Sequence, residues 1–110
     1  MKPDALRGHL DALILAVLEH ESLHGYAIME ALQERSGGVL SLPTGTLYPA
    51  LRRLERAGLV RGAWSTVSGR NRRTYRLTAA GRRALAAERT DWRAFAAVID
   101  GVLRPAPRHA

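Results

Sequence analysis

Cysteine is absent from this sequence of 110 residues, and its absence excludes several kinds of chemistry. A chain without thiols forms no disulfide bond, uses no thiol nucleophile and builds no cysteine-based zinc site. Long hydrophobic runs are also missing. The apolar segment 10–18 is far too short to span a bilayer, and Asp4, Asp11 and Glu19 interrupt its surroundings. We therefore expect a cytoplasmic protein with no secretory leader and no membrane contact.

Enzymatic motifs are missing as well. The chain contains neither a nucleophile elbow nor a phosphate-binding loop. The four histidines have neither metal-ligand spacing nor an acidic partner in a recognisable motif; they are His9, His20, His24 and His109. We expect surface or packing roles for them, with His24 capping the start of a helix. We expect no catalytic residue, no metal and no cofactor.

Lysine is nearly absent, since sixteen of the seventeen basic residues are arginine. The formal net charge is +7, and the segment 44–76 alone accounts for it, with eight arginines against the single acid Glu55. Charge confined to one region indicates an extended anionic partner, because evenly spread charge would mainly serve solubility. Arginine suits bidentate contacts with phosphate and guanine, although a GC-rich genome would equally favour it.

The segment 42–60 predicts a short helix with two different faces. One face is apolar at helical spacing and consists of Leu47, Ala50, Leu51 and Leu54. The opposite face consists of Gly45, Pro49, Arg52 and Arg56. We expect the helix to start at 44–46, capped by Thr44 or Thr46, because Pro49 is tolerated only near a helix start. Gly58 predicts a left-handed stop. One face therefore suits a core and the other a polyanion.

The segments before and after this helix predict a helix-turn-helix with a hairpin. Two amphipathic helices come first, over 9–19 and from Tyr26 to the glycines 37–38. After Gly58 the apolar period changes toward two, which predicts a strand over 59–67, a loop over 68–71 and a returning strand over 73–77. In the returning strand Arg73, Tyr75 and Leu77 would share a face.

A final helix is predicted from 79 to 103, capped by Thr78 and ended by Arg104 and Pro105. Its apolar residues recur in a heptad-like stripe, with Glu88 beside them: Leu85, Trp92, Phe95, Ile99 and Val102. The helix is too long for this small core, so we expect these five residues to form a homodimer seam. The alternative is that the stripe folds back on the chain's own first helix.

Together these elements predict a mainly α fold with a small β-hairpin, namely a winged helix-turn-helix followed by a long dimerisation helix. The predicted parts are a DNA-binding domain over 1–77, the dimerisation helix over 78–104 and a disordered tail over 105–110.

Several motifs resemble the PadR family of bacterial transcriptional regulators, in particular its short members with one carboxy-terminal helix. They are His24-Gly25-Tyr26, the Thr44-Gly45-Thr46-Leu47-Tyr48-Pro49 core of segment 41–55, Gly58-Leu59-Val60, and Arg72-Arg73-Thr74-Tyr75-Arg76-Leu77 with Thr78 and Gly81. The Gly-Thr-Leu-Tyr-Pro block is specific, whereas the closing Leu-Thr-x-x-Gly occurs in many winged-helix regulators. The resemblance covers nearly the whole chain. It implies a homodimeric repressor whose third helix enters the major groove and whose wings touch the flanking backbone.

The residues expected to contact double-stranded DNA lie on the third helix, on the hairpin and at the second helix. They are Tyr26, Thr44, Gly45, Thr46, Tyr48, Pro49, Arg52, Arg53, Arg70, Asn71, Arg72 and Arg73. Gly45 would let backbone approach a phosphate, and the threonine hydroxyls stand at a helix amino terminus, which favours anions. Three alternatives remain: Tyr48 as a core residue, Tyr26 likewise as a core residue, and the hairpin tip as a solvated loop.

Trp92 and Phe95 are first of all packing residues, but aromatic side chains at a dimer seam can also sandwich a flat ligand. The resemblance implies the same, because an aromatic residue of this helix binds ligands in some short PadR relatives. We therefore expect a dimeric repressor of an inverted-repeat operator, released by a small aromatic effector. One alternative is a ligand-binding dimeric interaction module whose DNA contact is secondary, and another is a non-specific architectural protein.

Overall fold

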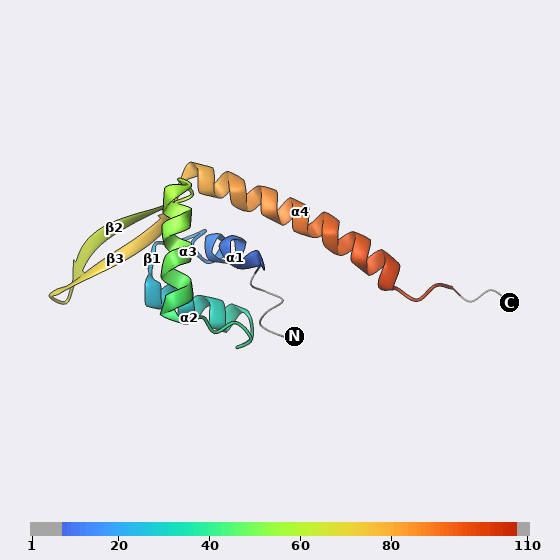
Figure 1. The fold of residues 1–110 in the computed structure, drawn as a ribbon, viewed down its shortest axis with the longest axis horizontal. Coiled ribbons are helices and arrows are strands. Elements are labelled where there is room, and N and C mark those ends of the chain that lie inside the picture. Colours follow the sequence, from blue (N-terminus) through green and yellow to red (C-terminus); the bar gives the residue numbers. More distant parts are fainter. Residues whose placement is uncertain (1–7, 108–110) are drawn as a thin grey trace.

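The apolar faces of three short helices meet in one core in the computed structural model, which describes residues 8–107. These helices are α1 (Leu10–Val17), α2 (Gly25–Arg35) and α3 (Thr44–Arg56). The strands are β1 (Leu23–His24), β2 (Val60–Val67) and β3 (Arg70–Leu77), and the chain continues into α4 (Ala79–Leu103). Figure 1 shows the hairpin of β2 and β3 and the helix α4 leaving the helical layer on opposite sides. The predicted winged helix-turn-helix with a long final helix is confirmed.

Two parts of the predicted domain division fall partly outside the described residues. Segment 1–7 of the first domain lies outside them, and so do residues 108–110 of the predicted tail, including His109. Residues 105–107 form neither helix nor strand.

The core is built from aliphatic side chains of all three short helices. Its largest fully buried members are Ile14, Leu18, Ile28, Leu47 and Leu51. All four residues predicted for the inner face of α3 are buried. Burying one such leucine stabilises the fold by roughly 1.5–3 kcal/mol, so this stripe fixes which way α3 faces.

The start of α3 differs in its chemistry from the prediction. The helix begins at Thr44, but Pro43 occupies the capping position, and its carbonyl accepts hydrogen bonds from the amides of Thr46 and Leu47 at 3.0 and 3.1 Å. No threonine side chain caps the helix. Pro49 lies inside the helix, deeper than expected. A proline there withholds one hydrogen bond from the Gly45 carbonyl, a loss that the buried leucine stripe outweighs.

His24 occupies the capping position of α2 as predicted, but its side chain makes no capping hydrogen bond. Its backbone is extended, because it belongs to β1, which pairs with β3 through Leu23↔Tyr75 and His24↔Thr74. This pairing makes a three-stranded antiparallel sheet in the order β1-β3-β2. Strand β1 was not predicted, since two residues show no periodicity.

The hairpin turn is tighter than predicted. Only Ser68 and Gly69 lie outside the ladder, with φ angles of 53° and 76°. Two central residues with positive φ match the right-handed twist of the flanking strands, which explains why so short a turn suffices. Arg70 and Asn71 therefore belong to β3, and the predicted loop over 68–71 is wrong.

The start of α4 is fixed against the end of α3. The Thr78 hydroxyl accepts a hydrogen bond from the Gly81 amide at 3.0 Å, which confirms the predicted cap, and donates one to the Gly58 carbonyl at 2.6 Å. Gly58 has the predicted left-handed conformation, with φ 76°. A Cβ on Gly81 would collide with the Leu59 carbonyl oxygen, so only glycine allows this close approach.

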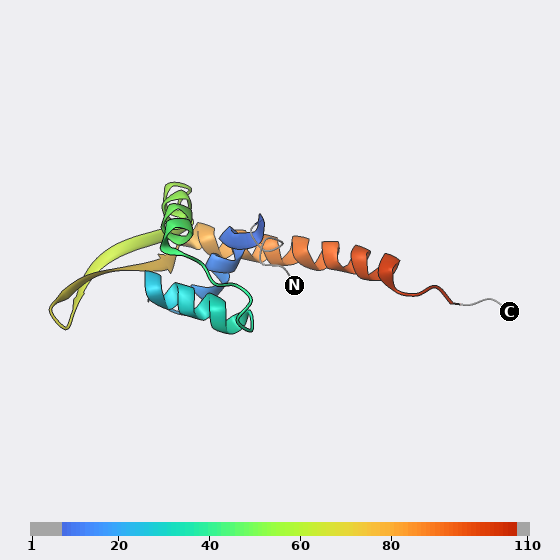
Figure 2. The same ribbon diagram turned by 60° about the horizontal axis from the view of Figure 1, so that its bottom comes forward.

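The apolar stripe of α4 is divided between two environments. Leu85 is buried in the chain's own core and is 3% exposed, so it has no surface left for a dimer seam. The predicted role of Leu85 is therefore corrected. The stripe folds back on its own chain at this end, and Trp92 still reaches His9, with ring centroids 5.5 Å apart. Figures 1 and 2 show the carboxy-terminal end of α4 with no other helix or strand beside it. Its large hydrophobic side chains are exposed there: Trp92, Phe95, Val98, Ile99, Val102 and Leu103.

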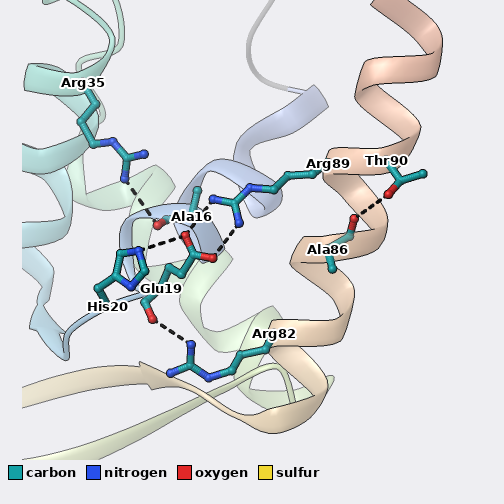
Figure 3. A network of polar contacts seen from close by, with 8 residues as sticks. All are labelled: Ala16, Glu19, His20, Arg35, Arg82, Ala86, Arg89 and Thr90. Atoms are coloured by element: carbon teal, nitrogen blue, oxygen red, sulfur yellow. Dashed lines mark hydrogen bonds and ion pairs between the residues drawn. The ribbon is translucent and has the colours of Figure 1, made fainter.

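Figure 3 shows the polar network that ties α4 to the end of α1. The Arg89 guanidinium donates two hydrogen bonds to the Glu19 carboxylate, at 2.6 and 2.8 Å. Arg82 donates to the Glu19 carbonyl at 2.8 Å, and His20 lies 3.4 Å from the same carboxylate. The bidentate pair with Arg89 lowers the pKa of Glu19 from 4.5 to about 2.

This pair predicts a pH-dependent contribution to stability. Because the folded-state pKa of Glu19 is depressed, its stabilisation is present above pH 4.5 and is lost as the pH falls toward about 2. We expect the wild-type protein to have a higher melting temperature than Glu19→Gln at neutral pH. This difference should vanish as the pH falls from 4.5 to about 2. Glu21→Gln, at a nearby exposed carboxylate, is the control. A difference that is independent of pH would contradict the assignment.

Candidate nucleic-acid interface

The outer face of α3 carries the first group of candidate residues. Thr44, Gly45, Arg52, Arg53 and Arg56 are exposed, in contrast to the buried leucine stripe of the same helix. A Cβ on Gly45 would meet nothing within 4 Å, so packing does not require this glycine. Its effect is to leave the backbone of the first turn accessible. The predicted division of α3 into an apolar and a basic face is therefore observed.

The two adjacent arginines of α3 differ in their partners. Arg53 donates to the Asp11 carboxylate at 3.0 Å, which links α3 to α1, and both side chains are about half exposed. Exposed pairs of this kind contribute little to stability and can exchange for a phosphate. Within residues 8–107, no ion pair involves Arg52. Arg52 is therefore the better placed of the two for a direct contact with an anion.

The two tyrosines of the predicted site have different surroundings. Tyr48 is half-buried and packs against the core, and a Cβ on Gly25 would lie only 2.8 Å from its Cζ. The glycine at the start of α2 thus makes room for this ring. Tyr26, the next residue of α2, is 63% exposed. Tyr48 therefore packs against the core with part of its surface still accessible, while Tyr26 is largely exposed, and the predicted DNA contact of each residue stays a prediction.

The register of the hairpin separates its arginines onto two faces. Arg73 pairs with Trp64 and Tyr75 with Gly62, so Arg73, Tyr75 and Leu77 share one face as predicted. Arg70, Arg72 and Arg76 alternate onto the other face. Asn71 accepts a hydrogen bond from the Thr66 hydroxyl at 3.1 Å. The hairpin therefore presents its basic residues in two directions rather than as one tip.

Arg73 is held within the chain. Its guanidinium donates to the Glu55 carboxylate of α3 at 2.8 Å and lies 5.6 Å from the Trp64 ring centroid. The hydrogen bond to Glu55 raises the pKa of Arg73, and burial together with the Glu55 charge raises the pKa of Tyr75. Arg73 therefore differs from Arg70 and Arg72, the other predicted arginine contacts of the hairpin, in having an ion-pair partner within the described residues.

A cleft of about 560 Å³ lies between the hairpin, α2 and α3. It brings together five of the predicted contact residues and four that were not predicted: Tyr26, Tyr48, Asn71, Arg72 and Arg73, with His24, Gly25, Trp64 and Tyr75. The predicted residues of the α3 outer face do not line it. Trp64 is 70% exposed, and its place on the strand could have been inferred from its alternation with Ser65 and Ala63.

A second cavity, of about 400 Å³, lies between α1 and α4. Trp92 and Leu85 line it, with His9 and Leu13 from the α1 side. The Trp92 ring stands edge-on to His9, with centroids 5.5 Å apart, and lies 5.7 Å from Phe95. Of the two residues predicted to bind a ligand, only Trp92 lines this cavity.

Over residues 8–107, no cluster of three or more His, Asp or Glu side chains could hold a metal ion. None of the helices in that range is long and apolar enough to cross a membrane.

Known proteins resemble this chain in sequence and in fold. A transcriptional regulator of Mycobacterium tuberculosis is 43% identical over 81 residues, which cover 71% of this chain and 73% of the relative. A PadR family transcription regulator from Clostridium difficile has a solved structure with a TM-score of 0.79 and 33% identity, covering 86% of this chain and 98% of that one. A transcriptional regulator from Clostridium thermocellum has a TM-score of 0.82 and 26% identity, with coverages of 92% and 99%.

The sequence model of the transcriptional regulator PadR-like family matches residues 14–87, which include the second half of α1, all of α2 and α3, the hairpin and the start of α4. The sequence match, the similar folds and the basic face of α3 all indicate the same family, and the chain belongs to the PadR family of transcriptional regulators.

Proposed function

We propose that this chain is a homodimeric, sequence-specific DNA-binding repressor that acts in the cytoplasm and catalyses no reaction. The observation that carries the proposal is the division of α3, whose leucine stripe is buried while Arg52, Arg53 and Arg56 point outward. A short helix with this exposed basic face fits the major groove. The arginines of the adjacent hairpin extend the positive surface along the duplex.

The exposed end of α4 supports a homodimer. Six large hydrophobic side chains there are between 42% and 79% exposed, from Trp92 to Leu103. The helix has 25 residues and is thus roughly 37 Å long, enough for a second copy to pack along its outer half. The seam comprises Trp92, Phe95, Ile99 and Val102 from the sequence prediction and adds Val98 and Leu103. A two-fold dimer of this kind would bind an inverted repeat.

A small aromatic effector is the proposed regulator. The cavity beside Trp92 lies at the base of the exposed stripe, so a planar ligand there would contact the helix that joins the two copies. Such a ligand changes DNA binding only if it prefers one spacing of the two α3 helices. The second candidate function, a ligand-binding interaction module, rests on the same cavity and predicts ligand binding without a preference for any duplex.

The dimer seam is tested by Ile99→Asp. We expect this change to give a monomer in light scattering, because it would place an unpaired carboxylate inside the apolar interface. Ala97→Asp is the matched control, since Ala97 is exposed on the opposite side of the same helix. Ile99→Asp that remains a dimer, with Ala97→Asp also dimeric, would reject this interface.

The groove helix is tested by Arg52→Ala. We expect specific duplex binding to weaken by roughly 1–3 kcal/mol if Arg52 contacts a base edge, and equally for all sequences if it holds a phosphate. The specific duplex is first identified by selection from a random pool and footprinting. Arg104→Ala, at the far end of α4, removes the same charge as a control. Equal binding by wild type and Arg52→Ala to specific and random duplexes would remove Arg52 from the interface.

The effector site is tested by fluorescence in a Trp64→Phe background, which leaves Trp92 as the sole tryptophan. Flat aromatic dyes are titrated with and without the specific duplex, and we expect them to quench Trp92 less when the duplex is bound. The coupling must be reciprocal, so the same dyes should weaken duplex binding. Quenching that ignores DNA would favour the ligand-binding module, and no quenching would leave Trp92 as a packing residue.

A further inference from the structure

The side chain of Arg73 crosses the hairpin from β3 to α3. Arg73 is opposite Trp64 in the ladder, and its guanidinium passes over the neighbouring position, Gly62, on β2. A Cβ on Gly62 would lie 2.6 Å from Arg73 Nε and 2.8 Å from its Cζ. Real side chains do not approach so closely, so any residue other than glycine would displace the guanidinium.

The guanidinium is held from three sides once it has crossed Gly62. Its Nη2 atom donates to Glu55 Oε2 at 2.8 Å, and the two side chains are 31% and 26% exposed. The Trp64 and Tyr75 rings lie 5.6 and 5.9 Å from Arg73 Cζ, within the range of a cation–π contact. A planar group fixed by a carboxylate and two rings has little freedom to turn toward another anion.

The ion pair adds a side-chain link between α3 and the hairpin, whose base is already anchored by the pairing of β3 with β1 and by the buried side chains of Val60, Tyr75 and Leu77. Figures 1 and 2 show the hairpin projecting from the helical layer, with its turn far from every helix. Within residues 8–107, the Glu55–Arg73 pair is the one salt bridge between α3 and the hairpin. Glu55 is also the single acidic residue of the basic segment 44–76.

We infer that Arg73 is a positioning residue that fixes the hairpin against α3 through Glu55, so that both elements reach the same stretch of duplex. Gly62 provides the passage for its side chain, and Trp64 holds the guanidinium from the hairpin side. Arg73 thus acts on DNA binding through Glu55, while Arg70 and Arg72 on the opposite hairpin face remain available for phosphates. The inference rests on the proposed DNA-binding function.

Whether removing the Glu55 carboxylate strengthens or weakens DNA binding distinguishes a positioning role of Arg73 from a direct phosphate contact. Removing a carboxylate beside a polyanion ordinarily strengthens binding. If Glu55 holds the hairpin in place, Glu55→Ala weakens specific binding instead, by about tenfold. Glu34→Ala, which removes an exposed acid from α2, is the control and leaves specific binding unchanged or slightly stronger. Glu55→Gln keeps an oxygen that can accept from Arg73 and recovers part of the loss.

Gly62→Ala and a charge exchange provide independent tests. Gly62→Ala alters no charge but displaces the Arg73 guanidinium, so it weakens binding as Glu55→Ala does. Arg73→Glu abolishes specific binding, and adding Glu55→Arg to it restores part of the affinity only if the two residues act as a pair. Footprints of Glu55→Ala and Gly62→Ala keep the central protection made by α3 and lose the flanking protection made by the hairpin. Melting temperatures identify any variant that fails to fold.

Arg72→Ala calibrates the same assay, because loss of one phosphate contact flattens the salt slope by about 0.9. Folded Glu55→Ala and Gly62→Ala that bind like wild type, with Arg73→Ala weakened, would overturn the inference and make Arg73 a phosphate contact. A double variant no better than Arg73→Glu would also overturn it. Wild-type protein without salt-sensitive, specific duplex binding would instead reject the proposed function.

Discussion

Burial of the leucine stripe of α3 is the constraint on which the rest of the structure depends. Leu47, Leu51 and Leu54 leave the helix no freedom to rotate about its axis, because turning it would expose them to water. The same stripe outweighs an interior proline and a first turn without a side-chain cap. With the inner face fixed, Arg52 and Arg56 have only the outward direction left. The basic surface is thus a consequence of packing on the opposite side.

The sequence predicted those features that depend on local periodicity or on single special residues. The faces of α3, the bounds of α4, the Thr78 cap and the conformation of Gly58 are of this kind. The features that were not predicted depend on contacts between residues that are far apart in the sequence. Strand β1 is too short to have a period, and Arg73 finds Glu55 across 18 positions. A heptad pattern likewise cannot show where the chain's own core ends, which is why Leu85 was placed in the seam.

The arginines of the basic segment therefore have different roles despite their similar sequence context. Arg73 is paired with Glu55 and stacked near aromatic rings, Arg53 is paired with Asp11 at the surface, and Arg52 has no ion pair within residues 8–107. Formal charge counts all three alike. An arginine can exchange its internal partner for a phosphate only if its guanidinium group is free to move. The exposed Arg53–Asp11 pair can be exchanged at far lower cost than the half-buried Arg73–Glu55 pair.

The helix α4 runs without a break from the core to the exposed stripe, and this continuity limits where residues can be inserted or deleted. Leu85 belongs to the core and Trp92 to the exposed part, with continuous helix between them. Inserting or deleting a single residue there would rotate everything beyond it by about 100° and carry the exposed side chains to another side of the molecule. Length variation should therefore be confined to loops and chain ends, or occur within α4 only in steps that restore the helical phase.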